Sequence, residues 1–342
     1  MFEGTYFDGT PLDRTYAETR MRNEPLVEIS QTKGTSDTHP FLSPTDEWAG
    51  FEIRPFKLGP YALSQPSGSY LRDALRKGMV FQATLGINPY QYGIIAASDN
   101  HAGGQTYSEQ AYTLSRGGRA AAESLGVVPV DKAGRGFRET AARYHSASGL
   151  TGVWAEENTR AAIYAALKRR ETFGTSGTRI KVRLTGGFDQ RAAQGLEIAA
   201  QSGQLTFDAW ALADPEAAKL QRLQMIKGWV EKGESKERVF DIACAGDRPV
   251  DPNSHRCPEN DAWVDTSTCA YGAESGAAEL STTWTDPFYQ PDQHAFYYLR
   301  ALENPTCRWS TWAAVRAGTT PRPDLPLTIQ ERAWSSPIWI SP

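Results

Sequence analysis

The sequence lacks a long hydrophobic run and any excess of positive charge. No apolar stretch approaches the roughly 20 residues that a membrane-spanning helix needs, and the first twenty residues have neither the basic nor the apolar part of a signal peptide. The net charge is −4 and charged residues make up 22% of the chain, whereas nucleic-acid binders concentrate Lys and Arg on one face. We therefore expect no membrane span and no nucleic-acid partner.

Several catalytic and repeat signatures are also missing. The chain has no G-x-S-x-G motif, no glycine-rich nucleotide loop, no C-x-x-C pair and no repeat of fixed period. Hydrolysis through a Ser-His-Asp or Cys-His arrangement, nucleotide binding by such a loop, and solenoid or propeller architectures are thus disfavoured. A chain of 342 residues with 40% hydrophobic content can still form one large domain or two ordinary ones.

The few cysteines are clustered. Cys244, Cys257, Cys269 and Cys307 all fall in the last third of the chain. Four cysteines allow three pairings that the sequence does not rank, although Cys244 with Cys257 and Cys269 with Cys307 close the shortest loops. A zinc cluster is the rival interpretation, but the usual zinc-ligand spacing is absent. Disulfides favour an oxidising compartment, which predicts a periplasmic or extracellular location.

The first half of the chain mixes short strands with helices. Leu71, Leu75 and Met79 recur at helical spacing, which predicts a helix there, and a second helix is expected after a cap at Asn158 or Thr159. The apolar runs at 26–29 and 93–97 are too short for helices and predict strands.

From about residue 178 the pattern becomes alternating. Residues 180–184 and 205–211 place apolar side chains on one face and predict half-buried strands. The segment 220–243 predicts two further strands separated by the turn-like EKGESKE. One more helix is expected from Asp292 to Leu302.

Asp99 and His101 form the most informative motif. They follow the strand at 93–97, and residues i and i+2 of an extended chain point the same way. Parallel α/β folds carry their sites at the carboxyl ends of strands, and Gly103 and Gly104 permit the sharp turn needed there. The alternative is an Asp that caps a loop beside a solvent-facing His.

Glu28 is a second candidate ligand, because a carboxylate among aliphatic residues is costly to bury unless it is paired, protonated or bound to a cation. Its alternative is the outward position of an alternating strand. His39, in the loop after that strand, either joins the same rim or is an ordinary loop histidine. Trp309, Trp312 and other tryptophans raise sugar stacking as an option, against a core role.

Several stretches resemble a family: LVEISQTKGTSDTHP, YGIIAASDNHAG, GLTGVWAEENTRAAIYAALKRRETFGTSGTRI, GAAELSTTWTDPFYQPDQHAFYYLRALENPTCRWSTW and TIQERAWSSPIW. They look like the C-terminal portion of a bacterial domain-of-unknown-function family related to the PHP (polymerase and histidinol phosphatase) metal-dependent hydrolases. The resemblance implies an α/β fold, with a partial, distorted β/α barrel in residues 1–177 and a β-rich region, which holds the expected disulfides, in residues 178–342.

The resemblance also implies a site. Asp99 and His101 match the final D-x-H metal motif, and Glu28 matches a glutamate that bridges metals. His39 matches a family histidine, with Lys33 in the same motif as a substrate-binding candidate. Arg179 matches an arginine that could face an anionic substrate; a structural ion pair is its alternative.

The chain departs from the family by lacking its opening H-x-H motif and a second Asp-His motif. The implied function is a metal-dependent hydrolase, acting on phosphoesters or on carboxyl esters and amides with zinc, manganese or iron. The metal site is expected to be incomplete, and activity weak or absent without a separate N-terminal half. The alternative is a noncatalytic exported module whose β-rich region contacts glycans or a partner protein.

Overall fold

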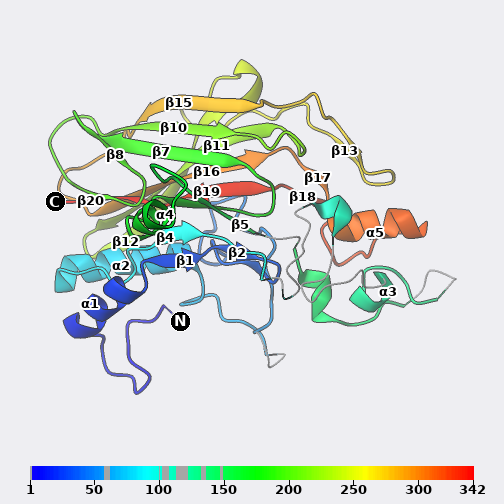
Figure 1. The fold of residues 1–342 in the computed structure, drawn as a ribbon, viewed down its shortest axis with the longest axis horizontal. Coiled ribbons are helices and arrows are strands. Elements are labelled where there is room, and N and C mark those ends of the chain that lie inside the picture. Colours follow the sequence, from blue (N-terminus) through cyan, green and yellow to red (C-terminus); the bar gives the residue numbers. More distant parts are fainter. Residues whose placement is uncertain are drawn as a thin grey trace.

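Two layers of β-strands, packed face to face, form the centre of the fold (Figure 1). The structure is a computed structural model and describes residues 2–57, 62–99, 101, 108–112, 122–131, 136–146 and 149–342. The small sheet, uppermost in Figure 1, is antiparallel and has the order β15 (Glu279–Thr285), β10 (Thr206–Leu212), β7 (Lys181–Gly187) and β8 (Arg191–Ala193).

The large sheet lies beneath the small one. Its order is β12 (Glu234–Cys244), β11 (Leu220–Glu231), β16 (Ala295–Glu303), β19 (Arg332–Ser335), β6 (Thr172–Thr175) and β5 (Leu150–Val153), all antiparallel. At one end, β20 (Ile338–Ser341) pairs with β16 and, in parallel, with β9 (Glu197–Ala199).

Alternation along the strands builds the core between the two sheets. Val182 and Leu184 of β7 and Phe207 of β10 are buried against Met225 and Leu299 of the large sheet. Each large apolar side chain removed from water in this way contributes about 1.5–3 kcal/mol. The strands predicted at 180–184, 205–211 and within 220–243 are confirmed, and the structure pairs β11 with β12 as a hairpin.

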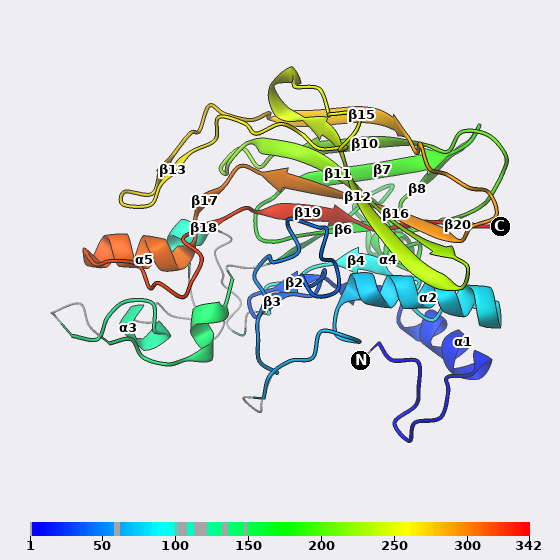
Figure 2. The same ribbon diagram turned by 180° about the vertical axis from the view of Figure 1, so that it is seen from behind.

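A second core covers the opposite face of the large sheet (Figure 2). Helix α2 (Leu71–Leu85) and the parallel pair β1 (Leu26–Glu28) and β4 (Gly93–Ile95) lie on this face. Leu71, Leu75 and Met79 of α2 pack there with Phe296 and Tyr298 of β16. The predicted helix and both predicted strands are confirmed.

The remaining elements are short and peripheral. They are α1 (Arg14–Asn23), β2 (Ser30–Gln31), β3 (Gly34–Thr35), η1 (Glu109–Ala111), α3 (Ala122–Leu125), η2 (Ala141–Tyr144), α4 (Arg160–Lys168), η3 (Ala245–Asp247), β13 (Val264–Asp265), β14 (Ala270–Tyr271), β17 (Thr306–Cys307), α5 (Trp309–Ala317) and β18 (Thr328–Ile329). Thr159 caps α4, since its hydroxyl accepts a hydrogen bond from the Ala162 amide at 3.3 Å. The figures place α5 and α3 together at one end of the molecule, away from α1 and α2.

The predicted β/α barrel is wrong. A β/α barrel closes parallel strands through helical crossovers, whereas the described strands form stacked, mostly antiparallel sheets, and the fold is β-rich. Even β5 and β6, which flank α4, are antiparallel neighbours. The expected domain boundary after residue 177 stays a prediction; strands from both sides of it share the large sheet, because β6 pairs with β19.

The helix expected from Asp292 to Leu302 is also wrong, because this segment contains β16. Every residue of β16 is buried, with Phe296 and Tyr298 facing α2, and Tyr297 and Leu299 facing the small sheet. A strand covered on both faces has no polar alternation, so its apolar run resembles a buried helix.

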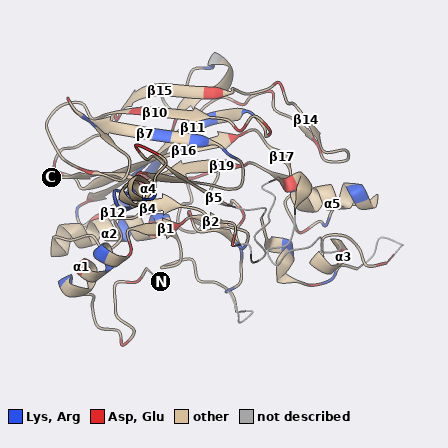
Figure 3. Ribbon diagram, viewed as in Figure 1, with Lys and Arg blue, Asp and Glu red and all other residues tan. Residues whose placement is uncertain are grey.

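Two disulfides confirm the shortest-loop pairing. Cys244 is bonded to Cys257, and Cys269 to Cys307, which leaves no free cysteine. In the described part of the chain, no helix has the length and apolar character needed to cross a bilayer. Figure 3 shows basic and acidic segments spread over many elements rather than gathered on one.

A cluster of paired charges is buried between β16 and α2. Asp46 accepts hydrogen bonds from Arg72 at 2.8 Å and from Arg300 at 2.7 and 3.0 Å. Asp37 accepts from Arg72 and, at 2.9 Å, from the Tyr298 hydroxyl. Burial alone would raise the pKa of Asp46, but the two guanidiniums hold it well below its usual range. Each charge in this paired cluster faces an opposite one, so its role is structural.

Candidate functional site

The ends of β1 and β4 bring several of the predicted site residues together. The strands are parallel neighbours, and Glu28 lies opposite Ile95. The Gln31 side chain donates to the Glu28 carboxylate at 3.1 Å and accepts from Lys33 Nζ at 3.4 Å. Two segments that are far apart in the chain thus meet at one rim, as the sequence suggested.

The rim continues from Lys33 to the D-x-H motif. Lys33 Nζ forms an ion pair with the Asp99 carboxylate, whose other oxygen lies 3.3 Å from His101 Nε2. Asp99 has a φ of 51°, in the left-handed region that Asp tolerates better than most residues. A continuous chain of polar contacts therefore joins Glu28, Lys33, Asp99 and His101. The turn expected at Gly103 and Gly104 lies outside the described residues.

His39 makes different contacts. Its Nδ1 accepts a hydrogen bond from the Phe41 amide at 3.1 Å, and its ring lies 5.5 Å from that of Tyr70. Partial burial lowers the pKa of His39, which favours the neutral imidazole. Its proposed place in the metal site therefore stays a prediction without a supporting contact.

The side chains at the rim are of types that bind divalent metal ions, but their arrangement does not form a metal site. Carboxylate oxygens and an imidazole nitrogen are common ligands of zinc, manganese and iron. Among the residues that the structure describes, however, no group of three His, Cys, Asp or Glu side chains is arranged to hold a metal ion. Lys33 instead supplies the positive charge at Asp99.

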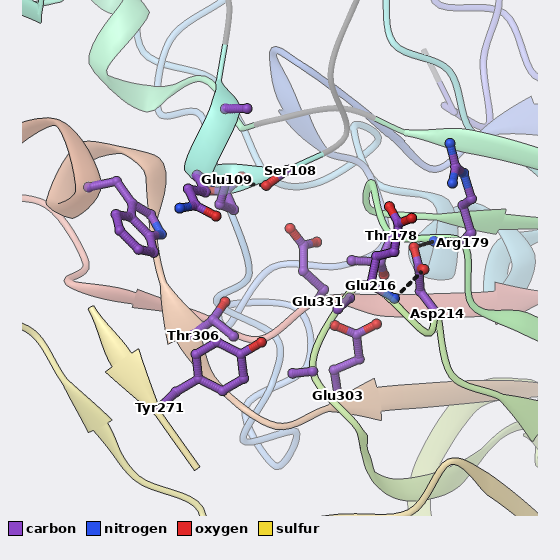
Figure 4. A pocket seen from close by; sticks show the side chains of 15 residues that line it. Ser108, Glu109, Thr178, Arg179, Asp214, Glu216, Tyr271, Glu303, Thr306 and Glu331 are labelled. Atoms are coloured by element: carbon purple, nitrogen blue, oxygen red, sulfur yellow. Dashed lines mark hydrogen bonds between the residues drawn. The ribbon is translucent and has the colours of Figure 1, made fainter. Parts of the chain in front are cut away.

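Arg179 lies elsewhere, in a cavity of about 520 Å³ between the sandwich and α5 (Figure 4). It belongs to the turn between β6 and β7, and its backbone N–H donates to the Asp214 carboxylate at 2.8 Å. The cavity is also lined by Ser108, Glu109, Thr178, Glu216, Tyr271, Glu303, Thr306, Trp312 and Glu331. Whether Arg179 contacts substrate stays a prediction.

Two buried glutamates face this cavity. Glu303 ends β16 and Glu331 precedes β19, and their relative exposures are 1% and 3%. In each, the Oε1 atom has no hydrogen-bond partner among the described residues. The second oxygen of Glu331 accepts from the Ser176 hydroxyl. Burial raises the pKa of both carboxyls well above the usual range, and Glu109 adds to the effect on Glu331.

Glu303 and Glu331 were not among the residues predicted from the sequence. Glu109, Glu303 and Glu331 come from distant segments, and no spacing rule connects them. The sequence does place Glu303 at the end of the apolar run AFYYLRALE and Glu331 inside TIQERAW. A carboxylate beside buried residues needs a compensating partner, so both positions could have been noted.

A shallower groove runs over the outer face of the small sheet. Trp210 and Arg183 line it with Asp208 and Thr283. Trp210 Nε1 donates to Glu279 at 2.6 Å, and Thr283 donates to Asp208 at 2.8 Å. An aromatic ring beside hydroxyl and charged groups is a surface on which a sugar can stack and form hydrogen bonds.

The fold and these sites define a disulfide-bonded β-sandwich protein with a polar rim and an acidic cavity. The chain belongs to DUF3604, a family described as a protein of unknown function, whose model matches residues 1–342. No curated protein and no solved structure matches the chain.

Proposed function

We propose that this protein is a metal-dependent hydrolase-like protein related to the PHP superfamily, with an incomplete metal site at the β1–β4 rim. The observation that supports the proposal is the unbroken chain of contacts from Glu28 through Gln31 and Lys33 to Asp99 and His101. Glu28, Asp99 and His101 are the proposed ligands of a zinc, manganese or iron ion.

Lys33 has two roles in this proposal. Its ammonium balances the Asp99 charge, with both side chains about one-quarter exposed. Were a metal ion bound at Asp99, it would compete with that ammonium for the carboxylate, and Lys33 would hold an anionic ester instead. In metal-dependent hydrolases the ion supplies a water of lowered pKa and polarises the phosphoryl or carbonyl oxygen.

Glu28, Asp99 and His101 would each supply one ligand to the metal ion. Catalytic zinc sites normally use three protein ligands, and these converge on the ion. Because the described residues form no such group, we expect weak metal binding and little turnover. Further ligands, from a separate N-terminal half, are the proposed complement. The two disulfides support a periplasmic or extracellular location for the assembly.

Metal content and phosphoesterase turnover test the proposal together. After incubation with zinc or manganese and removal of free metal, we expect the chain to retain metal at less than one ion per molecule. Asp99→Ala and His101→Ala should abolish that retention. The matched controls Asp261→Ala and His294→Ala remove the same side chains far along the sequence and should not change it. Robust turnover by the chain alone, or retention unaffected by Asp99→Ala, would contradict the proposal.

The second candidate is a noncatalytic module that binds glycans through the groove of the small sheet. Trp210 supports it, because it lies in this groove opposite Ser281 and its Nε1 donates to the Glu279 carboxylate. Calorimetry with neutral oligosaccharides tests it. Binding that Trp210→Ala abolishes and Asp99→Ala leaves intact would favour this function over hydrolysis.

A further inference from the structure

The acidic cavity between the sandwich and α5 has the features of a second ligand site. We propose that it binds a small organic cation, a ligand with a primary ammonium group held between Glu303 and Glu331. Figure 4 shows both carboxyl groups in the middle of the cavity, between Tyr271 and Thr178. The proposal is independent of the rim and of any hydrolase activity.

The unpartnered oxygens are the first observation. Glu303 Oε1 and Glu331 Oε1 are buried without a hydrogen-bond partner in the described part of the chain, and the Thr178 hydroxyl lies beside the Glu303 carboxyl. A buried polar atom without a hydrogen bond destabilises the folded protein, so a ligand that supplies the missing donor would be bound favourably. An ammonium group carries three N–H donors and can donate to both of these oxygens at once.

The surrounding charges are the second observation. Arg179 is the basic residue that lines the cavity, and Arg308, a charged neighbour of Glu109, is already bound to the Glu52 carboxylate by two hydrogen bonds of 2.8 Å. Glu109 accepts from the Trp309 amide at 2.6 Å. Asp214 also lines the cavity, so its walls carry more acidic than basic side chains. The imbalance favours a cationic occupant.

The size and walls of the cavity favour an organic cation over a bare metal ion. No three metal-ligating side chains converge within the described residues, and a volume of about 520 Å³ is in the range of small-molecule sites. Tyr271 and Trp312 also line the cavity. Aromatic rings attract ammonium groups through their negatively polarised faces and cover the apolar part of such a ligand.

Binding should release protons. Burial raises the pKa of both carboxyls, which favours their neutral form in the empty cavity. An ammonium ligand favours the ionised form, and each glutamate that ionises gives a proton to the buffer. Proton release therefore distinguishes binding at Glu303 and Glu331 from binding at exposed carboxylates, which are already ionised.

The test is calorimetry with 2-phenylethylammonium as the probe and 2-phenylethanol as its uncharged counterpart, in two buffers of different ionisation enthalpy. We expect the ammonium to bind with release of at least half a proton, and the alcohol to bind at least tenfold more weakly. Glu303→Gln and Glu331→Gln should each weaken ammonium binding at least tenfold. Glu234→Gln, at the exposed end of the β11–β12 hairpin, should leave it unchanged.

Thermal unfolding separates a lost site from a lost fold, since a glutamine of the same shape should leave both variants folded. Ammonium affinity that is equal in the wild type and both variants would overturn the proposal. Tighter binding of calcium than of the ammonium, abolished by Glu303→Gln, would also overturn it, because the site would then be a metal site. Failure of metal retention at the rim would leave this result unaffected.

Discussion

Arg300 and Glu303 lie three residues apart on β16, yet they belong to opposite kinds of buried cluster. Arg300 is held by Asp46 in the paired cluster, where every charge has a counterion. Glu303 faces a cavity with an oxygen that has no partner among the described residues. Burial of an ionisable side chain therefore does not by itself indicate function. A compensated cluster fixes the fold, whereas an uncompensated one that faces a cavity indicates a missing ligand.

The largest expected effect comes from breaking the paired cluster. Asp46→Asn removes the charge that two buried guanidiniums share. Removing one partner of a buried ion pair typically costs about 3–5 kcal/mol. We expect a loss of that size in the free energy of unfolding, measured in guanidinium chloride.

The control for this substitution is Asp208→Asn, which breaks the exposed ion pair with Arg191. Exposed pairs contribute about 0.2–1 kcal/mol. Equal losses for the two variants would show that the cluster at Asp46 is not held by its charges.

Removal of each disulfide should lower the free energy of unfolding by a different amount. Cys269 and Cys307 are 38 residues apart, and Cys244 and Cys257 are 13 apart. Loop-closure entropy predicts losses of about 4 and about 3 kcal/mol when each pair is replaced by serines. Denaturant unfolding of the two double variants measures the difference, and a larger loss for the 13-residue loop would contradict the entropic account.

The raised pKa values of Glu303 and Glu331 should make the stability of the protein depend on pH. Their pKa values are higher in the folded state, so the folded protein binds more protons than the unfolded chain, and stability falls as pH rises above about 4.5. Each group contributes a slope of at most about 1.4 kcal/mol per pH unit.

The double variant Glu303→Gln with Glu331→Gln should flatten this slope, so that it becomes more stable than the wild type toward alkaline pH. Urea unfolding between pH 5 and pH 9 provides the comparison. Parallel curves for the two proteins would mean that the glutamates titrate alike in the folded and unfolded states.

The smallest expected effect concerns the rim. Lys33→Met removes the ammonium that competes with a metal ion for Asp99. Because this ion pair is partly exposed, its contribution is at most about 1 kcal/mol, and we expect zinc or manganese to bind about two- to fivefold more tightly. Metal titration measures the change, and unchanged or weaker binding would remove Asp99 from the proposed ligand set.

The sequence predicted local structure well where a single periodicity applied. Leu71, Leu75 and Met79 indicated α2, and the alternation around Val182 indicated β7. It failed for β16, because a strand buried on both faces loses its alternation. The barrel was wrong for a related reason: β1 and β4 are parallel, but the direction of the other strands depends on long-range pairing that no local pattern records.

The candidate site was predictable only in part. Glu28 and Asp99 could be placed together because both follow short apolar strands, and parallel neighbours end at the same edge. The cavity could not be predicted, since Glu109, Glu303 and Glu331 meet only after the large sheet and α5 have packed. Their signal in the sequence is the cost of burial, which indicates that a partner is needed but not where it lies.

Infrared spectroscopy of the carboxyl groups tests most directly whether Glu303 and Glu331 form an uncompensated site. The account predicts a protonated-carboxyl band at neutral pH in the wild type, absent from the Glu303→Gln, Glu331→Gln double variant, and lost from the wild type when 2-phenylethylammonium is added. A wild-type spectrum without that band, or with a band that the ammonium leaves unchanged, would contradict it.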